Sequence, residues 1–222
     1  KFKDFTEVYT YDIISQKSNS TLEEIAEKTN YIFICLPTPM SADGSCNTSI
    51  LIKSIDNLID LGYESTIIIK STIIPGTTDS LNKKYKKLTV IHNPEFLTEK
   101  NAVNDFKNQN RKVIVGELSR IRNVAKFYSK LFPKATIIKT NAKEAEMIKY
   151  ITNTFLACKV SYANEIFKIC QVLRINYDKV IKNSMYDERL GKTHWSVPGH
   201  DGDFGYGGIC FPKDMKAFIK LF

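Results

Sequence analysis

The segment GYGGICFPKD (205–214) contains the residues best suited to covalent chemistry, with a cysteine between a glycine cluster and a charged pair. Its glycines allow the backbone to approach a ligand closely and to adopt positive φ. The Cys210 thiol has an ordinary pKa of about 8.5, which a nearby cation or a helix N-terminus lowers. Lys213 and a helix predicted to start near it would supply both. The segment predicts a nucleophilic thiolate, although taken alone it fits a buried cysteine in a turn equally well.

Lys149 and Asn153 form a second pair with chemical potential, because they are four residues apart in a segment with helical spacing. On a helix their side chains share one face, about 6 Å apart. An ammonium and an amide presented together suit a developing alkoxide, which needs fixed hydrogen-bond donors. The pair also fits a solvated lysine beside a polar surface residue.

Short apolar runs alternate with helical patterns through the first 140 residues. Such runs predict buried strands joined by helical crossovers, an α/β fold with a doubly wound parallel sheet. The strands are expected at 7–12, 31–36, 65–70, 88–92, 112–116 and 135–139. The helices are expected over 18–29, near 48–60, after Pro75-Gly76 and over 118–132.

Ligands of such sheets bind beyond the carboxyl ends of the strands. The residues predicted at those ends are Asp12, Pro37-Thr38-Pro39, Ser71-Thr72 and Asn93-Pro94-Glu95. An acid such as Asp12 after an early strand suits the ribose hydroxyls of adenosine and favours NAD over NADP.

From about residue 141 the apolar residues continue at helical spacing without Pro or Gly. A helix of about 30 residues would be roughly 45 Å long, which is more than the width of a small domain. It would support two domains or a subunit interface. A short helix near 176–184 and a Gly-rich stretch from Gly191 to Gly208 follow. We therefore expect one domain over 1–140 and a helical one over 141–222.

The composition of the 222 residues, 43% apolar and 25% charged, is that of a folded globular protein. No run of about 18 apolar residues predicts a membrane span, and no signal-peptide pattern opens the chain. A cytoplasmic protein is the expectation. Five cysteines without CxxC spacing predict neither a disulfide framework nor a metal site. Cys35, Cys158 and Cys170 lie in apolar segments and are expected to act as small hydrophobes.

The net charge of +8 comes from 32 Lys and Arg that are scattered through the chain. The only lysine cluster, KKYKK (83–87), ends a short predicted helix and indicates a solvated face, not a nucleic-acid site. Positive potential would also suit an anionic substrate that carries phosphates.

Six segments, in order, resemble the UDP-glucose/GDP-mannose dehydrogenase family. They are LPTP (36–39), KSTIIPGT (70–77), NPEFLTE (93–99), AEMIKYITNTFLACKVSYANE (145–165), DERLG (187–191) and VPGHDGDFGYGGICFPKD (197–214). The resemblance implies a Rossmann-like NAD-binding domain followed by a central helical domain for dimerisation and catalysis. The VPGHDG stretch is most similar to the UDP-glucose branch.

The family's reaction takes a primary alcohol through an aldehyde to a carboxylate with two NAD⁺. The resemblance implies that Cys210 forms a thiohemiacetal and then a thioester, which water hydrolyses. Covalent catalysis of this kind divides one difficult oxidation into easier steps. Asp214, Thr72 and Glu95 resemble the residues that handle the hydrolytic water.

The resemblance also implies ligand contacts. Those to NAD would come from Asp12, Thr38, Thr72, Glu99 and Lys213. Those to the nucleotide-sugar, with UDP-glucose expected, would come from Glu95, Phe96, Leu97, Lys149, Asn153, Arg189, Gly205, Tyr206, Gly207 and Gly208. Arg189 resembles an arginine that reaches the substrate from a neighbouring subunit, and the long helix suggests a homodimer.

The family's GxGxxG turn would precede Asp12 by about 20 residues. Only eleven residues precede Asp12, none of them glycine. We therefore expect a fragment that lacks this turn and the family's C-terminal nucleotide-binding domain.

Three other interpretations stay open: a dehydrogenase of GDP-mannose or UDP-N-acetylmannosamine, a non-catalytic remnant, and a cysteine hydrolase without NAD. The hydrolase is disfavoured because His92, His194 and His200 lie in none of the usual dyad contexts.

Overall fold

The computed structural model describes residues 2–97, 101–108, 110–115, 118–199 and 201–221. The chain divides into two compact units. The first comprises Lys1–Pro39 and Asn47–Lys149, and the second Met40–Cys46 and Tyr150–Phe222. Each unit is described by itself.

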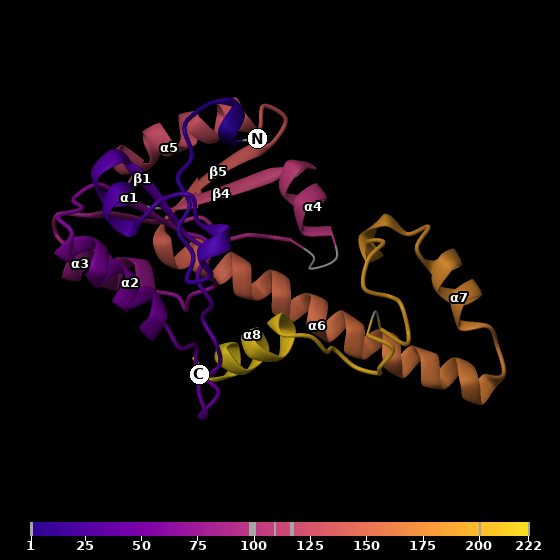
Figure 1. The fold of residues 1–222 in the computed structure, drawn as a ribbon. Helices are drawn as coiled ribbons and strands as arrows, with labels where there is room; N and C mark the ends of the chain where they lie inside the picture. The colour runs from indigo at the N-terminus through magenta and orange to yellow at the C-terminus, as the bar shows by residue number, and fades with distance from the viewer. Residues whose placement is uncertain (1, 98–100, 109, 116–117, 200, 222) are drawn as a thin grey trace. The chain divides into compact units, whose positions relative to one another are not determined.

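A five-stranded sheet forms the centre of the first unit, with the strands side by side in chain order (Figure 1). The strands are β1 (Tyr31–Ile34), β2 (Thr66–Ile69), β3 (Thr89–His92), β4 (Arg111–Val115) and β5 (Thr136–Thr140). β1, β2 and β3 are parallel to one another, and β4 is parallel to β5. The predicted α/β fold with its parallel strands is thus confirmed for these pairs.

One pairing corrects the prediction of a wholly parallel sheet, because β3 and β4 are antiparallel and meet at His92 and Val115. A buried apolar run reads the same in either direction, so it does not encode the direction of its strand. The connection between β3 and β4 contains α4 (Ala102–Asn108), which the apolar periodicity did not predict.

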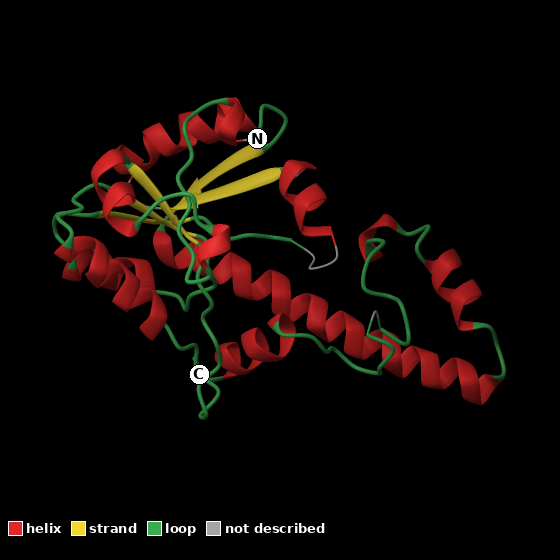
Figure 2. Cartoon of the chain, viewed as in Figure 1, coloured by secondary structure: helices red, strands yellow, loops and turns green. Residues whose placement is uncertain are grey.

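Helices cover both faces of the sheet (Figure 2). Alternate residues of β2 point to opposite faces, as the period of two in a strand requires. Ile67 and Ile69 pack with α2 (Ser49–Asp60) and α3 (Thr77–Lys84) in one apolar cluster. Ile68 packs instead with α5 (Leu118–Leu131) in another. The sheet and its carboxyl ends are therefore fixed from both sides.

The N-terminal segment differs from its prediction, because residues 7–12 form no strand. A strand needs a neighbouring backbone, whereas Thr10 is bonded to a nearby side chain. Its N–H donates to Asn19 Oδ1 at 2.6 Å, and the Asn19 N–H donates to the Thr10 carbonyl at 3.0 Å. The following helix, α1 (Leu22–Lys28), begins as predicted with a capping box between Thr21 and Glu24.

The second unit is helical. It contains most of α6 (Ala142–Leu173), then α7 (Tyr177–Ser184) and α8 (Cys210–Ile219). The long and short helices after residue 141 are thus confirmed. An apolar cluster in this unit comprises Ala163, Cys170, Tyr177, Ile181 and Trp195. No helix of the described residues is both long enough and apolar enough to cross a membrane.

Glu146, on the second turn of α6, fixes the loop between β2 and α3 in the first unit. Its buried carboxylate accepts hydrogen bonds from Gly76 N at 2.6 Å, Thr78 N at 2.8 Å and Thr78 Oγ1 at 2.6 Å. Burial raises the pKa of Glu146, and the hydrogen bonds from Thr78 and Gly76 oppose that rise. This carboxylate satisfies N–H groups at the start of α3 that no residue of that helix can pair.

We predict that Glu146→Ala lowers the free energy of unfolding by about 3 kcal/mol, because it leaves buried donors without an acceptor. The control is Glu144→Ala on the same turn. Glu144 is exposed and contributes to the capping of α6, so its loss should cost less than about 1 kcal/mol. Urea unfolding followed by circular dichroism measures both. Equal effects of the two substitutions would contradict the assignment.

Candidate active site

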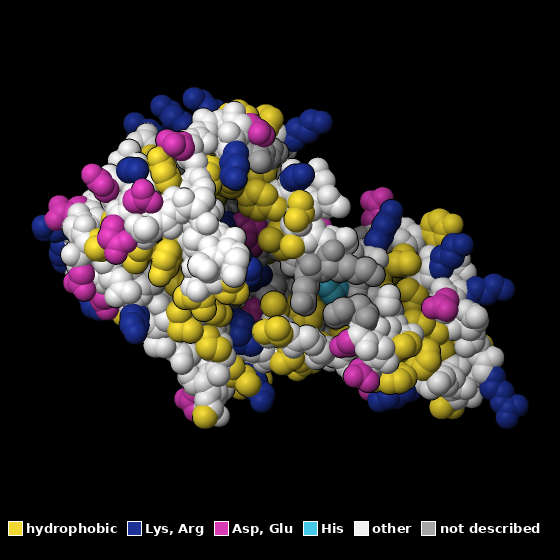
Figure 3. All heavy atoms as spheres, viewed as in Figure 1, with side chains coloured by type: hydrophobic (Ala, Val, Ile, Leu, Met, Phe, Trp, Pro, Cys, Tyr) yellow, Lys and Arg dark blue, Asp and Glu magenta, His cyan; other side chains and the backbone are white. Residues whose placement is uncertain are grey.

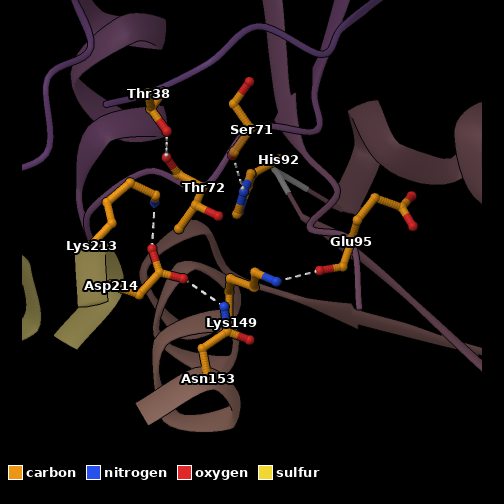
Figure 4. A network of polar contacts seen from close by, with 9 residues as sticks. All are labelled: Thr38, Ser71, Thr72, His92, Glu95, Lys149, Asn153, Lys213 and Asp214. Carbon is orange, nitrogen blue, oxygen red and sulfur yellow. Dashed lines mark hydrogen bonds and ion pairs between the residues drawn. The ribbon is translucent and has the colours of Figure 1, made fainter. Parts of the chain in front are cut away.

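The loops that follow β1, β2 and β3 lie together in the first unit, as parallel pairing requires. Thr38 Oγ1 donates to the Thr72 carbonyl at 2.8 Å (Figure 4). Ser71 Oγ donates to the Leu36 carbonyl at 2.6 Å. Both bonds join the β1 loop to the β2 loop. Thr38 and Thr72, both predicted to contact NAD, are therefore neighbours.

Lys70, directly after β2, makes an ion pair that the sequence analysis did not identify. Its Nζ pairs with Glu95 and donates to Asn93 Oδ1 at 2.5 Å. Only 8% of the Lys70 side chain is exposed, and burial lowers the pKa of its ammonium while Glu95 opposes that shift. A lysine at the end of an apolar strand was the available signal, since buried charges need partners.

Lys149 contacts the backbone of Glu95. Its Nζ donates to the Glu95 carbonyl at 2.6 Å and lies 5.4 Å from the centre of the Phe96 ring. Figure 4 shows this bond reaching from α6 to the segment after β3. Glu95 is therefore held through its backbone by one lysine and through its carboxylate by another.

A cavity of about 340 Å³ opens beside these residues. It is lined by Cys35, Leu36, Lys70, Ser71, Glu95, Leu97 and Phe106. Leu36, Leu97 and Phe106 give the cavity apolar walls, and Lys70, Glu95 and Ser71 add a cation, a carboxylate and a hydroxyl. The position after three parallel strands is where such folds bind dinucleotides.

Cys35 was expected to be a small buried hydrophobe, but its thiol is exposed and lines this cavity. Many protein atoms surround it, and this partial burial raises its pKa while the Lys70 ammonium opposes the rise. Cys158 is also exposed, whereas Cys170 is buried as predicted. A strand ends where its hydrogen bonds end, so a residue just past β1 can face a cavity.

His92, the last residue of β3, is fully buried, and its Nε2 lies 3.2 Å from the Ser71 carbonyl. Burial lowers the pKa of His92 to about 3. The imidazole is therefore neutral near pH 7 and stabilises the loop without acting as an acid.

In the second unit, Cys210 is the first residue of α8 and its side chain is exposed. The helix was expected to begin near Lys213. Its start at Cys210 instead places the sulfur at the helix N-terminus, where partial positive charge favours an anion. Asp214 follows one turn later on the same face of α8.

Asp214 is 1% exposed and ties α8 to α6 within this unit. Asn153 Nδ2 donates to its Oδ2 at 2.5 Å, and Lys213 pairs with its other oxygen (Figure 4). Asn153 and Asp214, predicted to share one site, are therefore in direct contact. Lys213 was expected to act on the thiol or on NAD, but its ammonium is paired with Asp214.

The loop before Cys210 depends on its glycines. Gly205 and Gly208 have φ of 84° and 75°, where other residues are strained. Gly205 N donates to Asn164 Oδ1 at 3.0 Å, which fixes the loop to α6. A Cβ on Gly207 would meet the exposed Asp201 carboxylate, which can turn aside, so the requirement for glycine is strongest at 205 and 208. Tyr206 is half-buried between these glycines.

The remaining predicted residues have local partners or lie outside the described residues. Asp12 accepts from Ile14 N at 2.8 Å in a loop, not at a strand end as predicted. Arg189 is exposed and forms a bidentate pair with Asp187. Leu97 lines the cavity. Glu99 lies outside the described residues, as does His200.

Comparison with known proteins gives two matches to one family. Residues 5–134 match the UDP-glucose/GDP-mannose dehydrogenase family, NAD binding domain, and residues 143–222 match its central domain. The prediction of NAD as the cofactor is confirmed by the first match.

Curated relatives are similar over most of the chain. The UDP-glucose 6-dehydrogenase AglM of Haloferax volcanii is 32% identical over 91% of the chain and 50% of its own length. The UDP-glucose 6-dehydrogenase of Rickettsia bellii is 32% identical over 99% of the chain and 50% of its own length. The chain thus spans about half of these relatives.

Solved structures are also similar to this chain in fold. A UDP-glucose dehydrogenase from Pyrobaculum islandicum has a TM-score of 0.77 and 30% identity, over 90% of this chain and 48% of that one. A UDP-D-ManNAc dehydrogenase from Pyrococcus horikoshii has a TM-score of 0.71 and 27% identity over the same shares. Matched along both units, the chain belongs to the UDP-glucose/GDP-mannose dehydrogenase family.

Proposed function

We propose that the protein oxidises the C6 alcohol of UDP-glucose to the carboxylate in two steps, with Cys210 as the covalent nucleophile. The observation that supports this most is the contact between Asn153 and Asp214, with Cys210 one turn before Asp214 at the start of α8. UDP-glucose is the proposed sugar because curated relatives about 32% identical carry that name.

The covalent step begins with the Cys210 thiolate. Its sulfur attacks C6 of the intermediate aldehyde, and the carbonyl π electrons move to the oxygen. The resulting alkoxide is stabilised by the Lys149 ammonium and the Asn153 amide, which lie one turn apart on α6. NAD⁺, when bound, supplies the oxidising power by accepting hydride in each of the two oxidations.

Hydrolysis then releases the acid. Water attacks C6 of the Cys210 thioester, the C–S bond breaks, and the sulfur leaves as a thiolate. The Asp214 carboxylate is the proposed base that takes the proton from the water. Its contacts with Lys213 and Asn153 hold the carboxylate in place. Thr72 and Glu95 are proposed to order the water.

The cofactor contacts are proposed from the first unit. Thr38 and Thr72 are expected to contact NAD, with the cavity beside Glu95 and Leu97 holding its reactive ring. Asp12, Glu99 and Lys213 remain predictions for the cofactor. Phe96, Arg189, Tyr206 and the glycines at 205, 207 and 208 remain predictions for the sugar nucleotide, and a cytoplasmic location is likewise part of this proposal.

We also propose that the protein is a homodimer whose interface includes one face of α6. Residues alternately three and four apart lie along that face, the spacing that two paired helices require. Its large apolar members are all more than half exposed: Ile151, Phe155, Tyr162, Ile169 and Val172. Figure 3 shows hydrophobic side chains reaching the surface where α6 and α7 lie. A second copy presents the same apolar face and would cover it.

We predict that Cys210→Ser abolishes net formation of UDP-glucuronate. Serine cannot form the thioester from which the acid is released, so turnover should fall by more than about 1000-fold. The assay uses the whole coding sequence that contains this chain, supplied with UDP-glucose and NAD⁺, and follows NADH and product. Unchanged production of the acid would refute the covalent role. Turnover of GDP-mannose but not UDP-glucose would change only the substrate.

We predict that the double substitution Phe155→Glu and Ile169→Glu yields a monomer. Four added charges at a two-fold interface would be buried without partners. Gln171→Glu, an exposed change on the opposite side of α6, is the control and should leave the dimer intact. Light scattering after gel filtration gives the molar mass. A dimer that survives the double substitution would contradict the interface.

A further inference from the structure

The ion pair between Lys70 and Glu95 has no part in the mechanism given above. We propose that Lys70 is a positioning residue that holds the Glu95 carboxylate in one orientation for thioester hydrolysis. This inference rests on the proposed function, in which Glu95 helps to order the water that hydrolyses the thioester.

Both side chains of this ion pair are largely shielded from solvent. The Lys70 side chain is 8% exposed and that of Glu95 19% exposed. An exposed ion pair contributes little and leaves its side chains free to turn. A largely buried cation keeps its partner in place, because separation would leave both charges poorly solvated.

The ammonium is itself fixed by a second acceptor. Lys70 Nζ donates to Asn93 Oδ1, and Tyr128 OH from α5 donates to the same oxygen at 2.5 Å. Asn93 and Tyr128 are both fully buried. The Lys70 ammonium is therefore bound to a buried residue of the first unit as well as to Glu95.

Glu95 is held at two points as a result. Lys149 binds its carbonyl at 2.6 Å, which fixes the backbone but leaves the carboxylate able to rotate. Lys70 binds the carboxylate. Removal of Lys70 would leave this backbone contact intact, so its effect on Glu95 should fall on the orientation of the carboxylate.

The pair also lines the cavity together with Cys35 and Ser71, so a ligand can reach it. If position 70 only had to fill space after the Ile67–Ile69 run, an apolar side chain would serve equally well. Replacing a buried ion pair by apolar residues is often neutral or stabilising. A charged pair on a cavity wall is better explained by a requirement for the charged carboxylate.

The test compares Lys70→Met and Lys70→Arg in the protein made from the whole coding sequence. Lys70→Met should lower kcat about 10- to 100-fold near pH 7 and change KM for UDP-glucose less than about 3-fold. Lys70→Arg, which keeps a cation beside the Glu95 carboxylate, should restore kcat.

A double-mutant cycle isolates the contact. In a Glu95→Gln background, Lys70→Met should lower kcat less than about 2-fold further. An equally large further loss of kcat in the Glu95→Gln background, or equal losses of kcat for Lys70→Met and Lys70→Arg, would overturn the proposal. Lys70→Gln, which can still donate to Asn93, takes the place of Lys70→Met if that variant does not fold.

Cys35 provides a readout that needs no turnover. The Lys70 ammonium opposes the burial that raises the pKa of the Cys35 thiol. Since only the thiolate is alkylated, Lys70→Met should slow the reaction of Cys35 with iodoacetamide several-fold, and Lys70→Arg should not. Peptide mass spectrometry separates Cys35 from the other cysteines.

The two readouts separate the hypotheses. If the parent protein oxidises no nucleotide-sugar while Cys35 still responds to Lys70→Met, the proposed function fails and the electrostatic contact stands. If UDP-glucose is oxidised and Lys70→Met leaves kcat unchanged, the role of Lys70 fails alone.

Discussion

Parallel pairing of β1, β2 and β3 is the constraint on which the first unit depends. It brings three carboxyl ends to one edge of the sheet, so Thr38, Thr72 and Glu95 lie together although far apart in sequence. β2, the middle one of these three strands, is fixed because Ile67 and Ile69 are buried on one face of the sheet and Ile68 on the other. The apolar core therefore determines where the polar loops emerge.

The polar groups at this edge are stabilised by one another. Lys70 meets Glu95 and Asn93, Tyr128 also meets Asn93, and Lys149 meets the Glu95 backbone. Each buried polar group needs a partner. The neutral His92 beneath them, with its pKa of about 3, adds no positive charge near pH 7.

The long helix α6 carries several roles along its length. Glu146 near its start fixes the loop before α3, and Lys149 binds Glu95 in the first unit. In the second unit Asn153 binds Asp214, which lies one turn after Cys210. The 32 residues of this helix span about 48 Å, since each residue advances by about 1.5 Å.

The sequence by itself determined the elements and the chemical groups. Apolar periodicity located β1, β2, β3, α5 and α6, and the motif around Cys210 indicated the family. These features depend on neighbours along the chain. Tertiary structure decided the antiparallel pairing of β4, the loop at Asp12, the exposure of Cys35 and the pairing of Lys213 with Asp214. It alone showed that Lys70 is bound to Glu95, because the partner of a buried charge is set by which strands lie side by side, and no local pattern encodes that.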